Sequence, residues 1–163
     1  MARTDNEKSA APYRFVALDR ERIDMAYALV RDSDPPVSLN QWRGYAQALL
    51  DEDVSRIAPR GIIVAEAPAD YIRGIFAYHV CPDLPLGNRL DLDCIAVPEA
   101  FDRRAIANAL IDQFNSLARH HDCRGVVTHL RHDQAWLDPF FRTTGYGTSE
   151  LQMRSLQSTV ESE

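Results

Sequence analysis

The pattern of hydrophobic and polar positions changes period several times along the chain, and each change marks a new element. Residues 13–18 alternate between apolar or aromatic and other side chains, which predicts a β-strand. Apolar residues at near-helical spacing follow over 23–30 and predict a helix. The segment 33–36, with its two prolines, ends this helix, and a second helix is predicted over about 39–50 with Ser38 as its N-cap. The chain therefore begins as strand, helix, helix.

The middle of the chain has the pattern of paired strands. Two β-rich runs, 61–65 and 72–78, are separated by a turn at 68–70, which is typical of an antiparallel hairpin. A second turn at 84–88 leads into a further strand predicted over 90–97. The middle of the chain therefore consists of a hairpin and a third strand joined by short connections.

After the third strand of this group the apolar positions fall four, four and three residues apart, which is one stripe of a helix. The stripe consists of Ile106, Leu110, Phe114 and Leu117. A short strand over 125–130 follows, and then a helix over about 134–143 that Asp133 caps and Gly145 stops. A closing strand is predicted over 151–156. The second half of the chain thus predicts a long helix, a strand, a helix and a strand.

Composition restricts the class of protein. The 163 residues allow one domain, and the 45% hydrophobic and 26% charged residues are typical of a globular protein without a membrane span. The net charge of -6, without a clustered basic face, disfavours nucleic-acid binding. The polar N-terminus lacks the apolar core of a secretory signal, so we expect a cytoplasmic protein. We expect a single domain over 13–157, with flexible ends at 1–12 and 158–163.

Cysteine and histidine form no metal-binding motif in the sequence. Cys81, Cys94 and Cys123 contain no CxxC pair, so neither a disulfide framework nor a zinc site is predicted, and we expect small core residues. His120 and His121 are adjacent, so on a helix their side chains point about a hundred degrees apart and do not converge on one ion. We expect them at a helix C-terminus, where a protonated imidazole interacts favourably with the helix dipole.

Short motifs in this order of elements resemble the GNAT superfamily of acetyltransferases over nearly the whole ordered chain. Ala65-Glu66, followed by Ile-Arg-Gly-Ile at 72–75, is similar to the family's "vAe…ivG" passage, and Phe-Phe-Arg-Thr-Thr-Gly-Tyr at 140–146 resembles its "fYekxGF" segment. The resemblance implies an α/β protein with a single mixed, mostly antiparallel twisted sheet flanked by about four helices. It also allows pairing as a homodimer.

The same resemblance implies acetyl-CoA as the co-substrate. The family's turn R/Q-x-x-G-x-G/A opens the long helix, and its free backbone amides and the helix dipole hold the pyrophosphate. In this chain the matching segment is 101–110. The residues expected to bind acetyl-CoA are Ile95, Val97, Arg103, Arg104, Ala105, Ile106 and Ala107. Asp102 departs from the pattern because its carboxylate repels a phosphate, and it can alternatively act as the N-cap of the helix.

Two carboxylates on the strand before this turn are the candidate catalytic groups. In some GNAT members a carboxylate on this strand deprotonates the acceptor amine, and Asp91 and Asp93 lie on one face of the predicted strand, where each raises the proton affinity of the other. A solvated strand face, or a pair with Arg89 or Arg73, explains them equally well. Phe141 stands where many members have the Tyr that protonates the CoA thiolate, and it cannot donate a proton.

Trp42 and Tyr45 are the candidate substrate-binding residues, as an aromatic wall in the second predicted helix, and helix packing explains them equally well. The sequence predicts an acetyl-CoA-dependent N-acetyltransferase that acts on a primary amine of a small molecule or peptide. Two alternatives stay open. One is a catalytically degenerate GNAT-like binding or regulatory module, indicated by Asp102, Arg103 and Phe141, and the other is a structural subunit.

Overall fold

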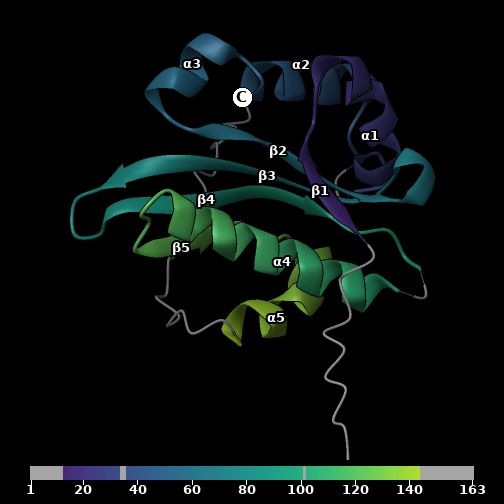
Figure 1. Cartoon of the computed structure of the whole chain (residues 1–163). Helices are drawn as coiled ribbons and strands as arrows, with labels where there is room; N and C mark the ends of the chain where they lie inside the picture. Colours follow the sequence, from purple (N-terminus) through teal and green to yellow (C-terminus); the bar gives the residue numbers. More distant parts are fainter. Residues whose placement is uncertain (1–12, 34–35, 101, 144–163) are drawn as a thin grey trace, which may run out of the picture.

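The structure is a computed structural model that describes residues 13–33, 36–100 and 102–143. Its strands form one five-stranded sheet in the order β1-β2-β3-β4-β5 (Figure 1). They are β1 (Arg14–Ala17), β2 (Arg60–Ala67), β3 (Tyr71–Asp83), β4 (Gly87–Ala96) and β5 (Gly125–Thr128). Neighbouring strands are antiparallel from β1 to β4, and β5 runs parallel to β4. The predicted mixed, mostly antiparallel sheet is confirmed.

Helices cover both faces of this sheet (Figure 1). One face carries α1 (Ile23–Val30), α2 (Leu39–Leu49) and α3 (Glu52–Ile57), and the other carries α4 (Arg103–His120) and α5 (Asp138–Arg142). Each side of the sheet has its own hydrophobic core. The core under α1 and α2 includes Trp42, Ile62, Val64, Ile75 and Ala77. The core under α4 includes Phe76, Leu90, Leu92, Ile106, Leu110 and Phe114.

A β-bulge in β4 interrupts the regular pairing of the central hairpin. Ala77 of β3 pairs with Cys94, whereas the next residue, Tyr78, pairs with Leu92, so Asp93 is the extra residue on β4. Such a bulge bends a strand and redirects a side chain, and bulges are frequent beside functional sites. The bulge therefore determines where the carboxylate of Asp93 points.

The helices before and after the central strands begin as the sequence predicts. Ser38 accepts a hydrogen bond from the Gln41 backbone N–H at 3.2 Å, and the Gln41 side chain accepts one from the Ser38 N–H at 2.8 Å. This reciprocal capping box explains why α2 begins at Leu39. The predicted helix over 23–30 is also confirmed as α1. The predicted long helix is confirmed as α4, with its apolar stripe facing the sheet.

The chain after β5 differs from the prediction of one helix over 134–143 capped by Asp133. A 3₁₀ helix, η3 (His132–Leu137), begins after Arg131, and it passes into α5 at Asp138. Pro139 explains the change, because its ring is tolerated in a first helical turn but cannot continue a helix that is already formed. The predicted Gly145 stop lies outside the described residues.

The structure also contains a short helix that the sequence pattern did not predict. Asp51 caps α3, accepting hydrogen bonds from the N–H groups of Asp53 at 3.0 Å and Val54 at 3.4 Å.

The predicted closing strand over 151–156 lies outside the described residues, so the prediction of one domain over 13–157 extends beyond them. None of the helices in the described part of the chain combines the length and apolar character of a membrane span.

Candidate functional site

A cavity of about 760 Å³ lies between the α1–α2 side of the molecule and the second half of β4. Its wall continues to the start of α4 and to η3. This volume is within the range of pockets that bind small molecules. The polar and aromatic residues that line it include Gln41, Trp42, Tyr45, Asp93, Arg103, Arg131, Asp133, Gln134 and Trp136.

The two parallel strands beside the cavity pair over only part of their length. β5 pairs with residues 89–92 of β4, so within the described residues the second half of β4 has no strand partner on this edge. Gln134, which is 8% exposed, donates a hydrogen bond from Nε2 to the carbonyl oxygen of Ile95 at 2.5 Å. An unpaired strand edge offers backbone N–H and C=O groups with which an extended ligand can pair. Backbone groups of β4 therefore line the cavity as well as side chains.

Trp42 and Tyr45, the predicted substrate-binding residues, both line the cavity, with their ring centroids 6.1 Å apart. Trp42 is also a core residue, because it is 2% exposed and its indole N–H donates to the Ile23 carbonyl oxygen at 2.7 Å. Tyr45 is half-buried, and burial raises the pKa of its hydroxyl well above the usual value. Tyr45 is therefore protonated at neutral pH and can donate a hydrogen bond into the cavity.

Three of the residues expected to bind acetyl-CoA line the cavity: Ile95, Val97 and Arg103. The guanidinium of Arg103 lies over the Trp136 ring, 3.9 Å from its centroid, and pairs with Glu99 at 3.3 Å. The stacking on Trp136 holds Arg103 at the edge of the cavity by a cation–π interaction.

The other four expected residues lie in the first two turns of α4. Ile106 and Ala107 are 0% exposed in the core, so their side chains face the sheet and not the cavity. Arg104 and Ala105 are exposed. Because the first intrahelical bond runs from the Ile106 N–H to the Asp102 carbonyl oxygen, the amides of Arg104 and Ala105 precede the bonded part of the helix.

Asp102 occupies the N-cap position of α4, but its side chain makes no capping hydrogen bond. Its carboxylate instead accepts hydrogen bonds from the Tyr13 hydroxyl at 2.6 Å and from Arg73 Nη2 at 2.8 Å. The hydrogen bond from Tyr13, with a further contribution from Arg73, lowers the pKa of Asp102 below its usual value. The interpretation of Asp102 as a side-chain cap is therefore wrong, and its negative charge is matched by Arg73.

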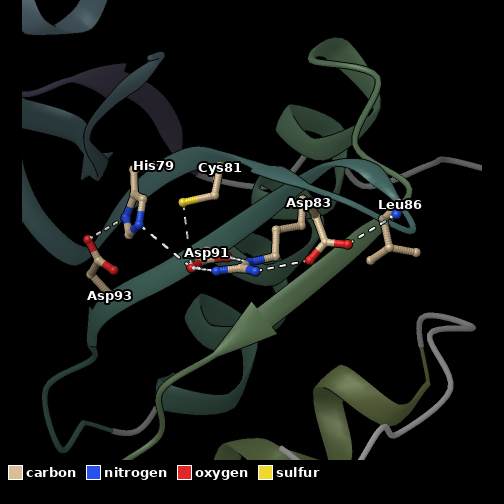
Figure 2. Close-up of polar contacts among 7 residues, drawn as sticks. His79, Cys81, Asp83, Leu86, Asp91 and Asp93 are labelled. Carbon is tan, nitrogen blue, oxygen red and sulfur yellow. Dashed lines mark hydrogen bonds and ion pairs between the residues drawn. The ribbon is translucent and has the colours of Figure 1, made fainter.

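The structure gives the two candidate catalytic carboxylates different surroundings. Asp91 is 4% exposed and does not line the cavity. Arg89 contacts both of its oxygens, Nε to Oδ1 at 2.8 Å and Nη2 to Oδ2 at 3.2 Å (Figure 2). For Asp91 the solvated-face interpretation is wrong, and the pairing with Arg89 is what the structure contains. Arg73, the other predicted partner, pairs with Asp102.

Asp93 lines the cavity, and its Oδ2 lies 2.8 Å from Nδ1 of His79 on β3. The other ring nitrogen of His79, Nε2, lies 3.6 Å from Oδ2 of Asp91. His79 therefore stands between the two carboxylates (Figure 2). His79 was not among the predicted site residues, and the one signal for it in the sequence is its alternation with Cys81 on one strand face. Its pairing with Asp91 depends on the β3–β4 register, which strand patterns alone do not specify.

Two further sequence expectations concern aromatic and histidine side chains on the α4 side. Phe141 packs edge-on against Phe114 with ring centroids 6.4 Å apart. His120 and His121 lie at the C-terminus of α4 as predicted, with ring centroids 5.0 Å apart. Burial, together with the neighbouring His120, lowers the pKa of His121. The expected protonation at the helix end is therefore disfavoured for His121.

Several solved structures share this fold. An aminoglycoside N-acetyltransferase in complex with CoA matches with a TM-score of 0.73 at 13% identity, over 93% of this chain and 98% of that chain. A ribosomal-protein-alanine N-acetyltransferase from Brucella melitensis biovar Abortus 2308 matches with a TM-score of 0.68 at 16% identity, over 89% and 98%. A transcriptional regulator from Bacillus halodurans C-125 matches with a TM-score of 0.70 at 13% identity, over 88% and 98%. No family model and no curated protein matches the sequence.

The chain therefore has the GNAT fold, as the resemblance of its motifs implied. At identities this low the likeness establishes the fold, and an activity has to be argued from the site itself. The site contributes a cavity beside an open strand edge, a protonated tyrosine, a carboxylate and the start of a long helix.

Proposed function

We propose that this protein is an acetyl-CoA-dependent N-acetyltransferase that acts on a primary amine. The observation that carries the proposal is that one cavity joins the open edge of β4 to the start of α4 and to the aromatic face of α2. Acetyl-CoA has an extended arm that can lie along the edge of β4 and a pyrophosphate that can bind at the start of α4. The amine acceptor then needs a third surface, which the aromatic face of α2 provides. The further expectations of a cytoplasmic location and a homodimer belong to the same proposal, and sedimentation analysis tests the second.

The start of α4 fits a pyrophosphate. Among the described residues the amides of Arg104 and Ala105 have no intrahelical acceptor, and the dipole of an 18-residue helix favours negative charge at this end. Arg103 adds a cation at the cavity edge. The carboxylate of Asp102 opposes an anion, but Arg73 already matches its charge at 2.8 Å. The acidic residue that departs from the family's cofactor turn is therefore electrostatically compensated.

Asp93 is the proposed base, and Tyr45 is the proposed hydrogen-bond donor to the leaving sulfur. Acetyl-CoA supplies the acetyl group as a thioester, so transfer forms a bond from the amine nitrogen to the carbonyl carbon and breaks the bond from that carbon to sulfur. Asp93 accepts the proton that the amine loses, directly or through water, and His79 orients its carboxylate through the 2.8 Å contact. The Tyr45 hydroxyl donates a hydrogen bond to the departing sulfur, in place of the hydroxyl that Phe141 lacks, and water supplies the proton that the thiolate takes up.

The charges of the cavity wall favour a cationic acceptor. The wall contains four carboxylates and two guanidinium groups, from Asp32, Asp93, Glu99, Asp133, Arg103 and Arg131. Both guanidinium groups pair with wall carboxylates, Arg103 with Glu99 at 3.3 Å and Arg131 with Asp133 at 3.3 Å. Asp32 pairs with Arg31, which lies outside the wall, at 3.2 Å. Among the described residues Asp93 is therefore the wall carboxylate without a guanidinium partner, and its charge attracts an ammonium group before it loses its proton.

Titration calorimetry with acetyl-CoA, beside free CoA, tests the cofactor part of the proposal. We expect micromolar binding to the unaltered protein. Ala105→Leu places a bulky side chain at the helix start and should weaken binding at least about tenfold, because the backbone can no longer approach the pyrophosphate. Ala48→Leu, at an exposed position of α2 outside the cavity wall, is the matched control. Equal affinity of the two variants would refute the helix start as the phosphate site.

The chemical roles are tested by thiol release from acetyl-CoA in the presence of a panel of primary amines. Asp93→Asn should lower kcat/KM by about 10² to 10⁴, the range for loss of a positioned base. Tyr45→Phe should lower kcat with little change in acetyl-CoA affinity, because only the hydroxyl is removed. Full activity of Asp93→Asn would exclude Asp93 as the base.

A second candidate function is a GNAT-like binding or regulatory module without catalysis. The specific observation in its favour is Phe141, which lacks a hydroxyl and packs edge-on against Phe114 at the position of the family's tyrosine. One of the proteins with the same fold is a transcriptional regulator. Acetyl-CoA binding without thiol release for any amine of the panel would favour this function over the enzyme.

A further inference from the structure

A second group of polar side chains lies along the β3–β4 hairpin, next to Asp93 but outside the cavity wall. His79 and Cys81 alternate on β3 and lie on the sheet face that carries α1, α2 and α3. Across the hairpin His79 pairs with Asp91, whose side chain lies on the same face. Figure 2 shows His79 and Cys81 pointing towards the carboxylate of Asp91. Three different ligand types are thus brought together by the strand register.

The spacing of these atoms matches that of metal ligands. Oδ2 of Asp91 lies 3.6 Å from Nε2 of His79 and 3.8 Å from Sγ of Cys81, and the three atoms lie within 4.8 Å of one another. Imidazole, thiolate and carboxylate are the ligands of zinc in proteins, and at metal–ligand distances of about 2.0–2.3 Å tetrahedral ligands are separated by about 3.3–3.8 Å. The hairpin therefore holds the three atoms nearly at coordination spacing.

Hydrogen bonds around the cluster orient the ligand atoms. Nδ1 of His79 lies 2.8 Å from Oδ2 of Asp93, and a proton on Nδ1 leaves the lone pair of Nε2 directed at Asp91 and Cys81. A carboxylate on the far nitrogen of a ligating histidine is the common arrangement in zinc sites. Nε of Arg89 donates to Oδ1 of Asp91 at 2.8 Å. Nη2 of Arg89 donates to Oδ2 at 3.2 Å and uses one lone pair of that oxygen. A carboxylate has about four lone-pair sites, two on each oxygen, so Oδ2 keeps one for a metal.

The charge of the cluster favours a dication. Asp83, Asp91 and Asp93 are opposed by the single guanidinium of Arg89, which pairs with Asp83 at 3.0 Å as well as with Asp91. Asp91 is 4% exposed and shares the charge of Arg89 with Asp83, so the three carboxylates carry more negative charge than this guanidinium offsets, and a dication would reduce the excess. His79 is 28% exposed, so an ion can reach the cluster from solvent.

We propose that Nε2 of His79, Sγ of Cys81 and Oδ2 of Asp91 bind a zinc ion, with Asp93 and Arg89 orienting the ligands. A zinc-bound thiol is deprotonated, so the Cys81 proton passes to solvent as the metal–sulfur bond forms. Three protein ligands leave the fourth tetrahedral position to water. The site shares His79 and Asp93 with the proposed acetyl transfer, but its metal binding does not require acetyl-CoA and is measured without it.

The site is tested by titrating the full chain with cobalt(II) chloride. The protein is prepared without a polyhistidine tag, because the tag would bind the metal itself. Cobalt(II) reports tetrahedral coordination by its visible absorption and a thiolate ligand by a charge-transfer band in the near ultraviolet. We expect both signals to saturate at one equivalent and to disappear when zinc chloride is added. Magnesium chloride should not compete, because a site with sulfur and nitrogen ligands selects against magnesium. Absence of the charge-transfer band would overturn the proposal.

Cys81→Ser removes the sulfur with little change of volume, and Cys123→Ser, at another partly buried free cysteine, is the matched control. We expect Cys81→Ser to lose the charge-transfer band and at least about tenfold in cobalt affinity, whereas Cys123→Ser keeps both. His79→Gln, at a partly exposed position, provides a second variant and should weaken binding about 10- to 100-fold with folding retained by circular dichroism. Equal affinity of either cluster variant and the control would overturn the proposal. Because no step uses acetyl-CoA, the result is separate from the fate of the proposed activity.

Discussion

Gly74 of β3 lies under α4, and replacing it with alanine tests the packing that positions the start of this helix. A Cβ at Gly74 would lie 2.7 Å from Cδ1 of Leu110 and 2.9 Å from Cγ2 of Ile106. Both side chains are 0% exposed, so they cannot turn into solvent, and α4 has to shift away from the sheet. Overpacking of this kind costs about 1–3 kcal/mol, and removing a strand glycine restores about 0.5–1 kcal/mol. The expected net destabilisation is about 1–2 kcal/mol.

Urea unfolding measures this loss, and with a slope of about 2 kcal/mol per molar urea the midpoint should fall by about 0.5–1 M. Gly44→Ala is the matched control, because Gly44 is inside α2 and a Cβ there meets nothing within 4 Å. The same chemical change should therefore stabilise the protein at Gly44, by about 0.5–1 kcal/mol. A Gly74→Ala midpoint at or above that of the unaltered protein would refute the close approach of α4 to β3.

Three further predictions concern stability. Ser38→Ala should cost about 1 kcal/mol in urea unfolding, because it removes the capping box of α2. Trp42→Phe should cost about 1–2 kcal/mol, because the Ile23 carbonyl oxygen loses its indole donor at 2.7 Å, and an unchanged midpoint would contradict this. Burial by itself would raise the pKa of Glu66, but hydrogen bonds from Arg14 and Arg22 hold it below its usual value. The ionised Glu66 therefore stabilises the folded protein above the unfolded pKa of about 4.3, and this stabilisation is lost as pH falls through the lower folded pKa. The urea midpoints of the unaltered protein and of Glu66→Gln should differ at neutral pH and converge in acid. Parallel midpoint curves down to about pH 3 would show that this carboxylate is not the group responsible.

Much of the fold could be predicted because the signals are local. The periods of hydrophobic residues predict the strands and the long helix, and Ser38 with Gln41 predicts the start of α2. The segment after β5 was predicted as one helix because Asp133 and Gly145 were interpreted as its cap and its stop, and Pro139 divides it through a backbone effect that these end signals do not include.

The candidate site was predicted less completely, because its chemistry depends on residues far apart in the sequence. Asp91 and Asp93 carry the same side chain two positions apart, yet one is paired with Arg89 in the sheet and the other lines the cavity. The bulge opposite Ala77 and Tyr78 causes this difference, and the residue types in β4 do not predict the bulge. His79 had no predicted role because its partners lie on another strand.

The sequence by itself determined the strands of the described sheet, the helices α1, α2 and α4, and the resemblance to the GNAT superfamily, because period, capping and short motifs are properties of neighbouring residues. Only the tertiary structure decided which charges are paired and which face a cavity, because strand register and packing bring distant residues together. Asp102 is the clearest case. Its identity suggested a side-chain cap or an uncompensated charge. Asp102 does stand at the N-cap position, but its carboxylate bonds to Tyr13 and Arg73 instead of capping the helix, and Arg73 compensates its charge.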